Sequence, residues 1–309
     1  MSSTPHLYAF TGNLLAERTL EFADWAPGRT QRARGESFQV GGKGINVSKM
    51  LTRLGATSTA LCFTGGAPGA ECVAWLQARG FLLQTFATDR PTRSGTVVRG
   101  GGHAETTFLG PDVPPSAAAA RACADYLDAQ PDGQVLALCG SFPGWAGNEF
   151  DPLRATLERW LARGILAADT YGPPLAWFAA RPLHLVKINA TELRTLGFAV
   201  TSVGETLASI DRRSPVQRWV VTDGPGAVWY RDTAGAPASL TPPPVHEVSA
   251  TGSGDVLHAS LLVSLFLENR PLEEAVARAI PLASANAAHA GIAEFPYVAG
   301  SENPRSPLG

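Results

Sequence analysis

A glycine-rich run, Thr251-Gly252-Ser253-Gly254-Asp255, contains the residue types that phosphoryl transfer requires. Gly252 and Gly254 permit backbone conformations closed to other residues, so successive N–H groups can converge on an anion. The apolar stretch that follows predicts a helix, whose N-terminus adds free N–H groups and partial positive charge. We therefore predict Asp255 as a general base, and Gly252, Ser253 and Gly254 as an anion hole. The alternative is a glycine-rich turn whose aspartate only stabilises the helix.

A second run, Gly41-Gly42-Lys43-Gly44-Ile45-Asn46, precedes another predicted helix. Its glycines let a ligand approach the backbone, Lys43 supplies a positive charge, and Asn46 can donate to and accept from hydroxyl groups. The spacing differs from both the Walker loop and the Gly-x-Gly-x-x-Gly dinucleotide motif. The run predicts a polar ligand site at a strand-to-helix turn, with a solvated lysine in an ordinary turn as the alternative.

Short apolar runs alternate with helical patterns along the chain, which indicates βαβ units and a mainly parallel sheet. Strands are expected at residues 7–10, 59–63, 135–138, 165–168, 183–186 and 219–221. Helices are expected at residues 44–54, 72–79, 116–129, 153–163, 254–267 and 272–289. Ser202 and Glu205 have the spacing of a capping box before a further helix.

Two polar, glycine-containing stretches do not follow this alternation. Residues from about 12 to 40 and from about 92 to 109 contain short alternating pieces, which predict strands. We interpret them as a small β-strand lid that leaves the main sheet twice and excludes water from the site, with ordinary surface loops as the alternative. The predicted organisation is a single α/β domain over residues 1–309 with a discontinuous lid.

The composition is that of a folded globular protein, with 45% hydrophobic and 17% charged residues among 309. The net charge of -2 provides no broad basic surface for nucleic acid or an acidic membrane. The four cysteines form no Cys-x-x-Cys pair, so we expect reduced, buried thiols. No secretory signal or membrane-spanning run is evident, and a cytoplasmic location is expected. Residues 301–309 are predicted to be a loose tail.

Taken together and in this order, the two glycine-rich runs resemble the signatures of the ribokinase-like carbohydrate kinases, within them the phosphofructokinase-B type branch. The resemblance extends over nearly the whole chain. It implies a three-layer αβα core with a mainly parallel sheet and a small β-strand lid. It also implies ATP as the phosphoryl donor, Mg²⁺ as the metal, and Asp255 as the catalytic base.

The resemblance assigns further residues to ligands. Residues implied for the sugar substrate are Asn13, Glu17, Gly41, Gly42, Lys43, Asn46, Arg93 and Ser141. Residues implied for ATP are Lys187, Asn189, Thr222, Gly224, Gly226, Ser284 and Asn286. Asn189 and Glu192 resemble the family's Asn-x-x-Glu motif, which implies indirect binding of Mg²⁺ through water.

Thr92-Arg93 favours the sugar-phosphate branch, in which the arginine binds a phosphate already on the substrate. The expected substrates are of the fructose 1-phosphate, fructose 6-phosphate or tagatose 6-phosphate type. One alternative is a kinase of an unphosphorylated sugar or nucleoside. Another is a weakly active sugar-phosphate-binding regulator, because Glu17 replaces the family's aspartate and Ser249-Ala250 departs from its usual pattern.

Several other polar residues have simpler interpretations. His258 and His289 have no partner at ligand spacing and are expected to serve packing or the surface. Arg29 and Arg32, in the predicted lid, are secondary phosphate candidates, although a solvated position is the simpler interpretation. Strand edges in a lid can pair with a second subunit, which suggests a homodimer through the lid.

Overall fold

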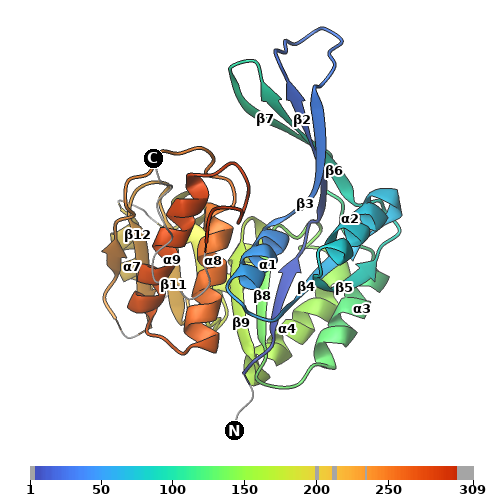
Figure 1. Cartoon of the computed structure of the whole chain (residues 1–309). Coiled ribbons are helices and arrows are strands. Elements are labelled where there is room, and N and C mark those ends of the chain that lie inside the picture. The colour runs from blue at the N-terminus through green and yellow to red at the C-terminus, as the bar shows by residue number, and fades with distance from the viewer. Residues whose placement is uncertain (1–3, 199–201, 211–213, 234, 298–309) are drawn as a thin grey trace.

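The computed structural model describes residues 4–198, 202–210, 214–233 and 235–297, so the predicted tail at 301–309 lies outside the described residues. Within these ranges the main sheet has nine strands in the order β13-β12-β11-β10-β9-β8-β1-β4-β5 (Figure 1). All neighbouring pairs are parallel except β11–β12 and β12–β13. The strands are β1 Leu7–Thr11, β4 Ser58–Thr64, β5 Leu82–Ala87, β8 Val135–Gly140, β9 Ile165–Thr170, β10 Leu185–Asn189, β11 Arg218–Thr222, β12 Val228–Asp232 and β13 Ala238–Leu240.

Helices cover both faces of this sheet. The α-helices are α1 Lys43–Arg53, α2 Gly66–Ala78, α3 Ala117–Asp128, α4 Asp151–Arg163, α5 Pro173–Ala179, α6 Ala190–Arg194, α7 Val203–Ile210, α8 Ser253–Leu262 and α9 Leu272–Ala287. One hydrophobic cluster packs α3, α4, α5 and α7 against the sheet, around Trp160 and Phe178. A second cluster packs α1, α8 and α9 against the opposite face, around Met50 and Leu261. The predicted three-layer αβα core is therefore confirmed.

The parallel pairing brings the carboxyl ends of the central strands to one edge of the sheet. Thr11 at the end of β1 pairs with Cys139 of β8, and Gly140 at the end of β8 pairs with Thr170 of β9. Ligands of open α/β sheets bind at this edge, just beyond the strand ends. The helices α1 and α8 begin near it, so their N-termini and the strand ends share one region.

A separate four-stranded sheet extends away from the core (Figure 1). Its strands, in the order β3-β2-β6-β7, are β2 Leu15–Phe22, β3 Gly35–Gly41, β6 Arg93–Gly100 and β7 His103–Leu109. Residues far apart in sequence are joined here, because β2 pairs with β6 along its whole length. The small β-sheet expected from the two polar stretches is thus present.

Some predicted elements differ from the observed ones in extent. The helix predicted at 254–267 is α-helical only to Leu262, after which Val263–Leu267 forms a π-helical turn. The helix predicted at 72–79 begins earlier, at Gly66. The four cysteines are free and buried, as expected. Among the described helices, no segment has the length and apolarity needed to cross a membrane.

Candidate active site

Asp255 lies in the first turn of α8, and only 5% of its surface is exposed. Asn46 of α1 donates a hydrogen bond from Nδ2 to Asp255 Oδ2 at 2.7 Å. Gly252, the residue before the helix, has φ of 78°, and a Cβ there would lie 2.4 Å from Ile292. Only glycine combines this left-handed conformation with so close a neighbour. The two glycine-rich runs predicted to form ligand sites therefore meet at one carboxylate.

The environment of Asp255 raises its pKa to about 6. Burial is the largest cause, because it penalises the charged carboxylate. The charges of Lys43 and Lys187 and the hydrogen bond from Asn46 act in the opposite direction, while the nearby charge of Asp169 raises the pKa further. Asp255 can thus gain and lose a proton near neutral pH, as a general base must.

Two lysines share one buried carboxylate next to Asp255. Lys43 Nζ lies 2.7 Å from Asp169 Oδ1, and Lys187 Nζ lies 2.9 Å from Asp169 Oδ2. Burial alone would raise the pKa of Asp169, but Lys187 and Lys43 outweigh it and hold that pKa below its usual range. Lys43 is also 3.5 Å from Glu192 Oε1. The site therefore carries two fixed positive charges at the strand ends, which suits a highly charged anion.

Lys187 lies directly against the backbone of the predicted anion hole. A Cβ placed on Gly254 would come within 2.6 Å of Lys187 Nζ, so a side chain there would displace the ammonium group. Lys187 is almost fully buried. Its charge and the amides at the start of α8 therefore face the same small volume.

At the other glycine-rich run, Gly42 is the residue before α1 and has φ of 120°. A Cβ on Gly42 would lie 2.6 Å from Thr11 Cγ2, so the end of β1 and the start of α1 are in close contact. Gly41 is similarly close to Leu15 of β2. The turn therefore joins the core to the small sheet.

Asn189 and Glu192 form a capping box at the start of α6. Asn189 N donates to Glu192 Oε2 at 2.9 Å, and Glu192 N donates to Asn189 Oδ1 at 2.8 Å. Together with the contact to Lys43, these bonds engage both carboxylate oxygens of Glu192. In the described part of the chain, no group of three or more His, Cys, Asp or Glu residues could hold a metal. The donor set suits Mg²⁺ only as an ion that keeps its water and phosphate ligands and meets Glu192 indirectly.

Four polar side chains at the base of the small sheet form a connected cluster. Asn13 Nδ2 donates to Ser141 Oγ at 3.0 Å and to Asp112 Oδ1 at 2.8 Å. Arg93 Nη1 donates to the same oxygen of Asp112 at 2.9 Å. The structure thus brings together the predicted residues Asn13, Arg93 and Ser141. The structure also adds Asp112 to this cluster. Asp112 follows β7 in a segment that has neither a helical nor a strand pattern, so the sequence does not single it out.

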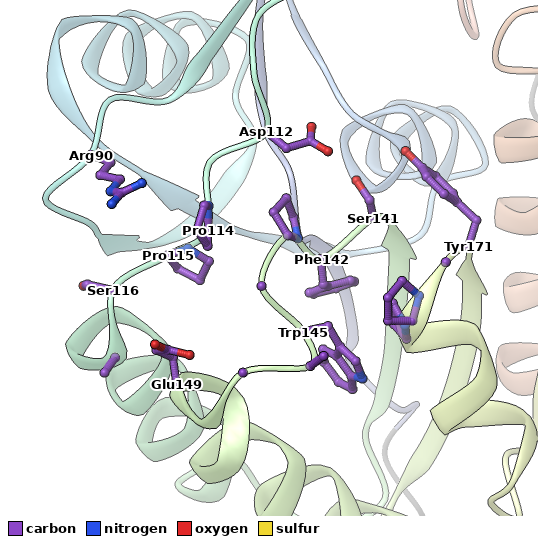
Figure 2. A pocket seen from close by; sticks show the side chains of 18 of the residues that line it. Arg90, Asp112, Pro114, Pro115, Ser116, Ser141, Phe142, Trp145, Glu149 and Tyr171 are labelled. Atoms are coloured by element: carbon purple, nitrogen blue, oxygen red, sulfur yellow. The ribbon is translucent and has the colours of Figure 1, made fainter.

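Glu17 lies on the small sheet, where its Oε1 accepts a hydrogen bond from Gln39 of β3. It lines a groove of about 690 Å³ together with Gly41, Gly42 and Asn46. A second cavity, of about 750 Å³, is lined by Asp112, Ser141 and Tyr171 (Figure 2). Of the residues predicted for the substrate, Ser141 therefore lines one cavity and Glu17, Gly41, Gly42 and Asn46 line the other. Lys43, whose Nζ lies 5.5 Å from the centre of the Tyr171 ring, contacts the lining of the second.

Of the residues predicted for ATP, Lys187 and Asn189 belong to the network around Asp169 and Glu192. Three others lie at the end of β11. Thr222 ends β11, Gly224 follows with φ of 54°, and Gly226 N donates to the Asp223 carbonyl at 2.9 Å, closing a turn.

Asn286 and Ser284, on α9, are buried. Asn286 Nδ2 donates to the Thr251 carbonyl at 3.0 Å and to Ser253 Oγ at 3.1 Å. The contacts of Asn286 position the loop predicted to form an anion hole. ATP binding by Ser284 and Asn286 stays a prediction.

His258, one turn after Asp255, is fully buried. Both ring nitrogens are buried without a hydrogen-bond partner in the described structure, and burial lowers its pKa to about 4. It packs as a neutral core residue. His289 is half-buried, with Nδ1 3.0 Å from the Ala285 carbonyl. Arg29 and Arg32 are exposed between β2 and β3.

Comparison with known proteins places these features in a family. Residues 11–296 match the family described as "pfkB family carbohydrate kinase". The chain is 26% identical over 286 residues to the 1-phosphofructokinase of Bacillus subtilis (strain 168), covering 91% of this chain and 92% of that protein. It is 28% identical over 259 residues to the ATP-dependent 6-phosphofructokinase isozyme 2 of Escherichia coli (strain K12), covering 80% and 81%.

Among solved structures, the phosphofructokinase-2 from Escherichia coli in complex with substrates and products superposes with a TM-score of 0.84 at 24% identity, covering 94% of this chain and 95% of that one. At this identity the likeness concerns the fold. The family match, in contrast, spans both glycine-rich runs and the strands between them. The chain belongs to the pfkB family of carbohydrate kinases.

Proposed function

We propose that this protein is an ATP-dependent kinase of a hexose phosphate. The observation that carries the proposal is the buried Asp255, which accepts a hydrogen bond from Asn46 and stands beside the amides that follow Gly252. The relatives of this chain include proteins named 1-phosphofructokinase and ATP-dependent 6-phosphofructokinase isozyme 2. The sugar-phosphate acceptor is of the fructose 1-phosphate, fructose 6-phosphate or tagatose 6-phosphate type.

In the proposed reaction, Asp255 accepts the proton of the attacking substrate hydroxyl, and the hydroxyl oxygen forms the new bond to the γ-phosphorus. The bond to the leaving ADP oxygen breaks in the same transfer. The amides of Gly252 to Gly254 and the ammonium group of Lys187 stabilise the transferring phosphoryl group. Asn46 holds the carboxylate of Asp255 in place.

ATP is proposed to bind at Thr222, Gly224 and Gly226, where a turn follows the end of β11. Mg²⁺ would be carried by the ATP phosphates and would meet Glu192 and Asn189 through water, since both are already engaged in the capping box. The ion would neutralise phosphate charge during the transfer. Lys43 and Lys187 supply protein charge at the same strand ends.

The sheet of β2, β3, β6 and β7 is proposed to act as a lid that closes over the sugar and excludes water.

The edge strand of this sheet, β7, carries two exposed apolar side chains, Phe108 at 57% and Leu109 at 55%. Apolar side chains on an edge strand favour contact with a second copy, and we propose a homodimer through this sheet. Sedimentation velocity tests this, because a monomer at micromolar concentration would contradict it. A cytoplasmic location is part of the proposal.

The choice of a phosphorylated acceptor depends on Arg93. Its side chain is 12% exposed and its guanidinium donates to the Asn13 carbonyl, a position that suits a bound phosphate. The alternatives are an unphosphorylated sugar or nucleoside as acceptor, and a weakly active regulator that binds sugar phosphate. A regulator would have no use for a base held in the position of Asp255.

The test is a coupled assay of the purified protein with ATP, Mg²⁺ and a panel of sugars and hexose phosphates. Turnover with a hexose phosphate, together with an Arg93→Ala variant whose KM for that substrate rises at least tenfold, is expected. Turnover with an unphosphorylated sugar and an unchanged KM in the variant would favour the first alternative. Binding without any turnover would favour the regulator.

A further inference from the structure

Asp112 occupies the centre of the cluster that we propose for the substrate phosphate. Its Oδ1 accepts from Asn13 Nδ2 at 2.8 Å and from Arg93 Nη1 at 2.9 Å. The side chain of Asp112 is 59% exposed, in contrast to that of Arg93. An internal carboxylate therefore takes the position at which two substrate-binding donors converge.

The carboxylate leaves part of the donor capacity of Arg93 unused. Arg93 Nη2 reaches only the Asn13 carbonyl, at 3.4 Å, and Arg93 Nε is buried without an acceptor in the described structure. A buried donor without a partner is unfavourable. A phosphate monoester offers three terminal oxygens and can occupy several guanidinium donors at once. The arginine is thus better matched to a phosphate than to one oxygen of Asp112.

Asp112 also opposes a second anion at this position. A phosphate that reaches Arg93 comes close to the carboxylate, and two like charges in contact repel each other. Asp112 can leave, because its side chain is more than half exposed and borders the cavity of about 750 Å³ (Figure 2). Binding of the phosphate then requires the ion pair between Asp112 and Arg93 to break.

We infer that Asp112 is a specificity-determining residue, a displaceable anion that occupies the phosphate position of the empty site and lowers the affinity for a phosphorylated acceptor. The inference rests on the proposed function, in which Arg93 binds the acceptor's phosphate. In the described part of the chain, Asp112 forms its hydrogen bonds and ion pair with Asn13 and Arg93 and with none of the residues proposed for ATP. The effect of Asp112 on affinity is therefore expected for the acceptor and not for ATP.

The variant Asp112→Asn keeps the size of the side chain and removes its charge. We expect the KM for the hexose phosphate turned over by the enzyme to fall about 2- to 5-fold, within the range of one exposed ion pair. The KM for ATP stays within twofold. Calorimetric titration with inorganic phosphate in the absence of ATP should show a matching gain in affinity. A KM that rises instead would mean that Asp112 positions Asn13 and Arg93, and would overturn the inference.

The matched control is Glu149→Gln, which removes one exposed carboxylate from the same cavity (Figure 2). Among the described residues, the ion-pair partner of Arg93 is Asp112 and not Glu149. If this control lowers the KM as much as Asp112→Asn does, long-range charge alone is responsible and the inference fails.

The variant Arg93→Ala separates the proposed phosphate position from the proposed role of Asp112. If Arg93→Ala leaves the KM unchanged, the phosphate position itself is wrong. If Arg93→Ala raises the KM while Asp112→Asn does not lower it, only the role of Asp112 is lost.

Discussion

Asn46 and Asp255 stand 209 residues apart in the chain, and a buried hydrogen bond of 2.7 Å joins their side chains. Asn46 lies in α1 and Asp255 lies in the first turn of α8, and these two helices pack on the same face of the main sheet. The amide fixes one carboxylate oxygen, while Lys43 and Lys187 lie close enough to influence the charge of the group. The acid–base behaviour of Asp255 therefore depends on both glycine-rich runs.

Replacing the proposed base should abolish most turnover. In Asp255→Asn, the side chain keeps its size but cannot accept the proton of the substrate hydroxyl. We expect kcat to fall by about 100- to 10,000-fold, the contribution typical of a general base, with KM values changed little. Steady-state kinetics measures this. Asp125→Asn, an exposed position on α3, serves as the control, and a normal kcat in Asp255→Asn would contradict the mechanism.

The pH profile should report the raised pKa of Asp255. The base works only when ionised, so kcat/KM should increase with pH, with a midpoint near the pKa of about 6, and level off above it. The bond from Asn46 lowers this pKa, so Asn46→Ala should move the midpoint upward by about one pH unit.

Thr52→Ala is the matched control for this shift. Thr52 lies on α1 and its hydroxyl donates to the Ser48 carbonyl of the same helix, so the pH profile of Thr52→Ala should match that of the wild type. Equal midpoints for the wild type and Asn46→Ala would show that another group limits the rate.

The central features of the site were predictable because they are local in the sequence. Gly252, Gly254 and Asp255 lie within one turn, and Lys187 lies in β10, directly after a clear apolar run. The small sheet was also predictable, since its strands alternate between polar and apolar residues. Their assembly at one edge follows from the parallel pairing of the strands.

Other features depend on tertiary contacts that no local pattern contains. Asp112 is an exposed residue in an irregular segment, and its role is visible only where the pairing of β2 with β6 brings Asn13 and Arg93 together. The spacing of a polar residue three positions before a glutamate was also ambiguous, because it fits both a helix cap and a metal motif. Glu205 N donates to Ser202 Oγ in the predicted cap, and the pair Asn189-x-x-Glu192, interpreted as a metal motif, forms a capping box as well.

The charge on Asp255 should weaken the fold. Its pKa is about 6 in the folded protein against 3.8 ordinarily, so the folded state binds more protons between these values. The free energy of unfolding therefore decreases as the pH rises through this window, by about 3 kcal/mol in all for a difference of about 2 in pKa. Asp255→Asn should be more stable than the wild type above pH 6, with the difference vanishing below about pH 4. Urea unfolding of both proteins across this range tests the prediction, and a constant difference would contradict it.

Asp169 should contribute more to stability than to chemistry, because it is the shared partner of two lysines. Asp169→Asn removes the only full counter-charge within 3 Å of Lys187 among the described residues, and Lys187 is almost fully buried. Breaking a buried pair by removing one partner costs about 3–5 kcal/mol, so the melting temperature should fall markedly. Asp132→Asn is the matched control, since its pair with Arg163 has a carboxylate that is 79% exposed and is worth about 0–1 kcal/mol. Equal losses in the two variants, measured by thermal unfolding at pH 7, would mean that the buried network has no special role.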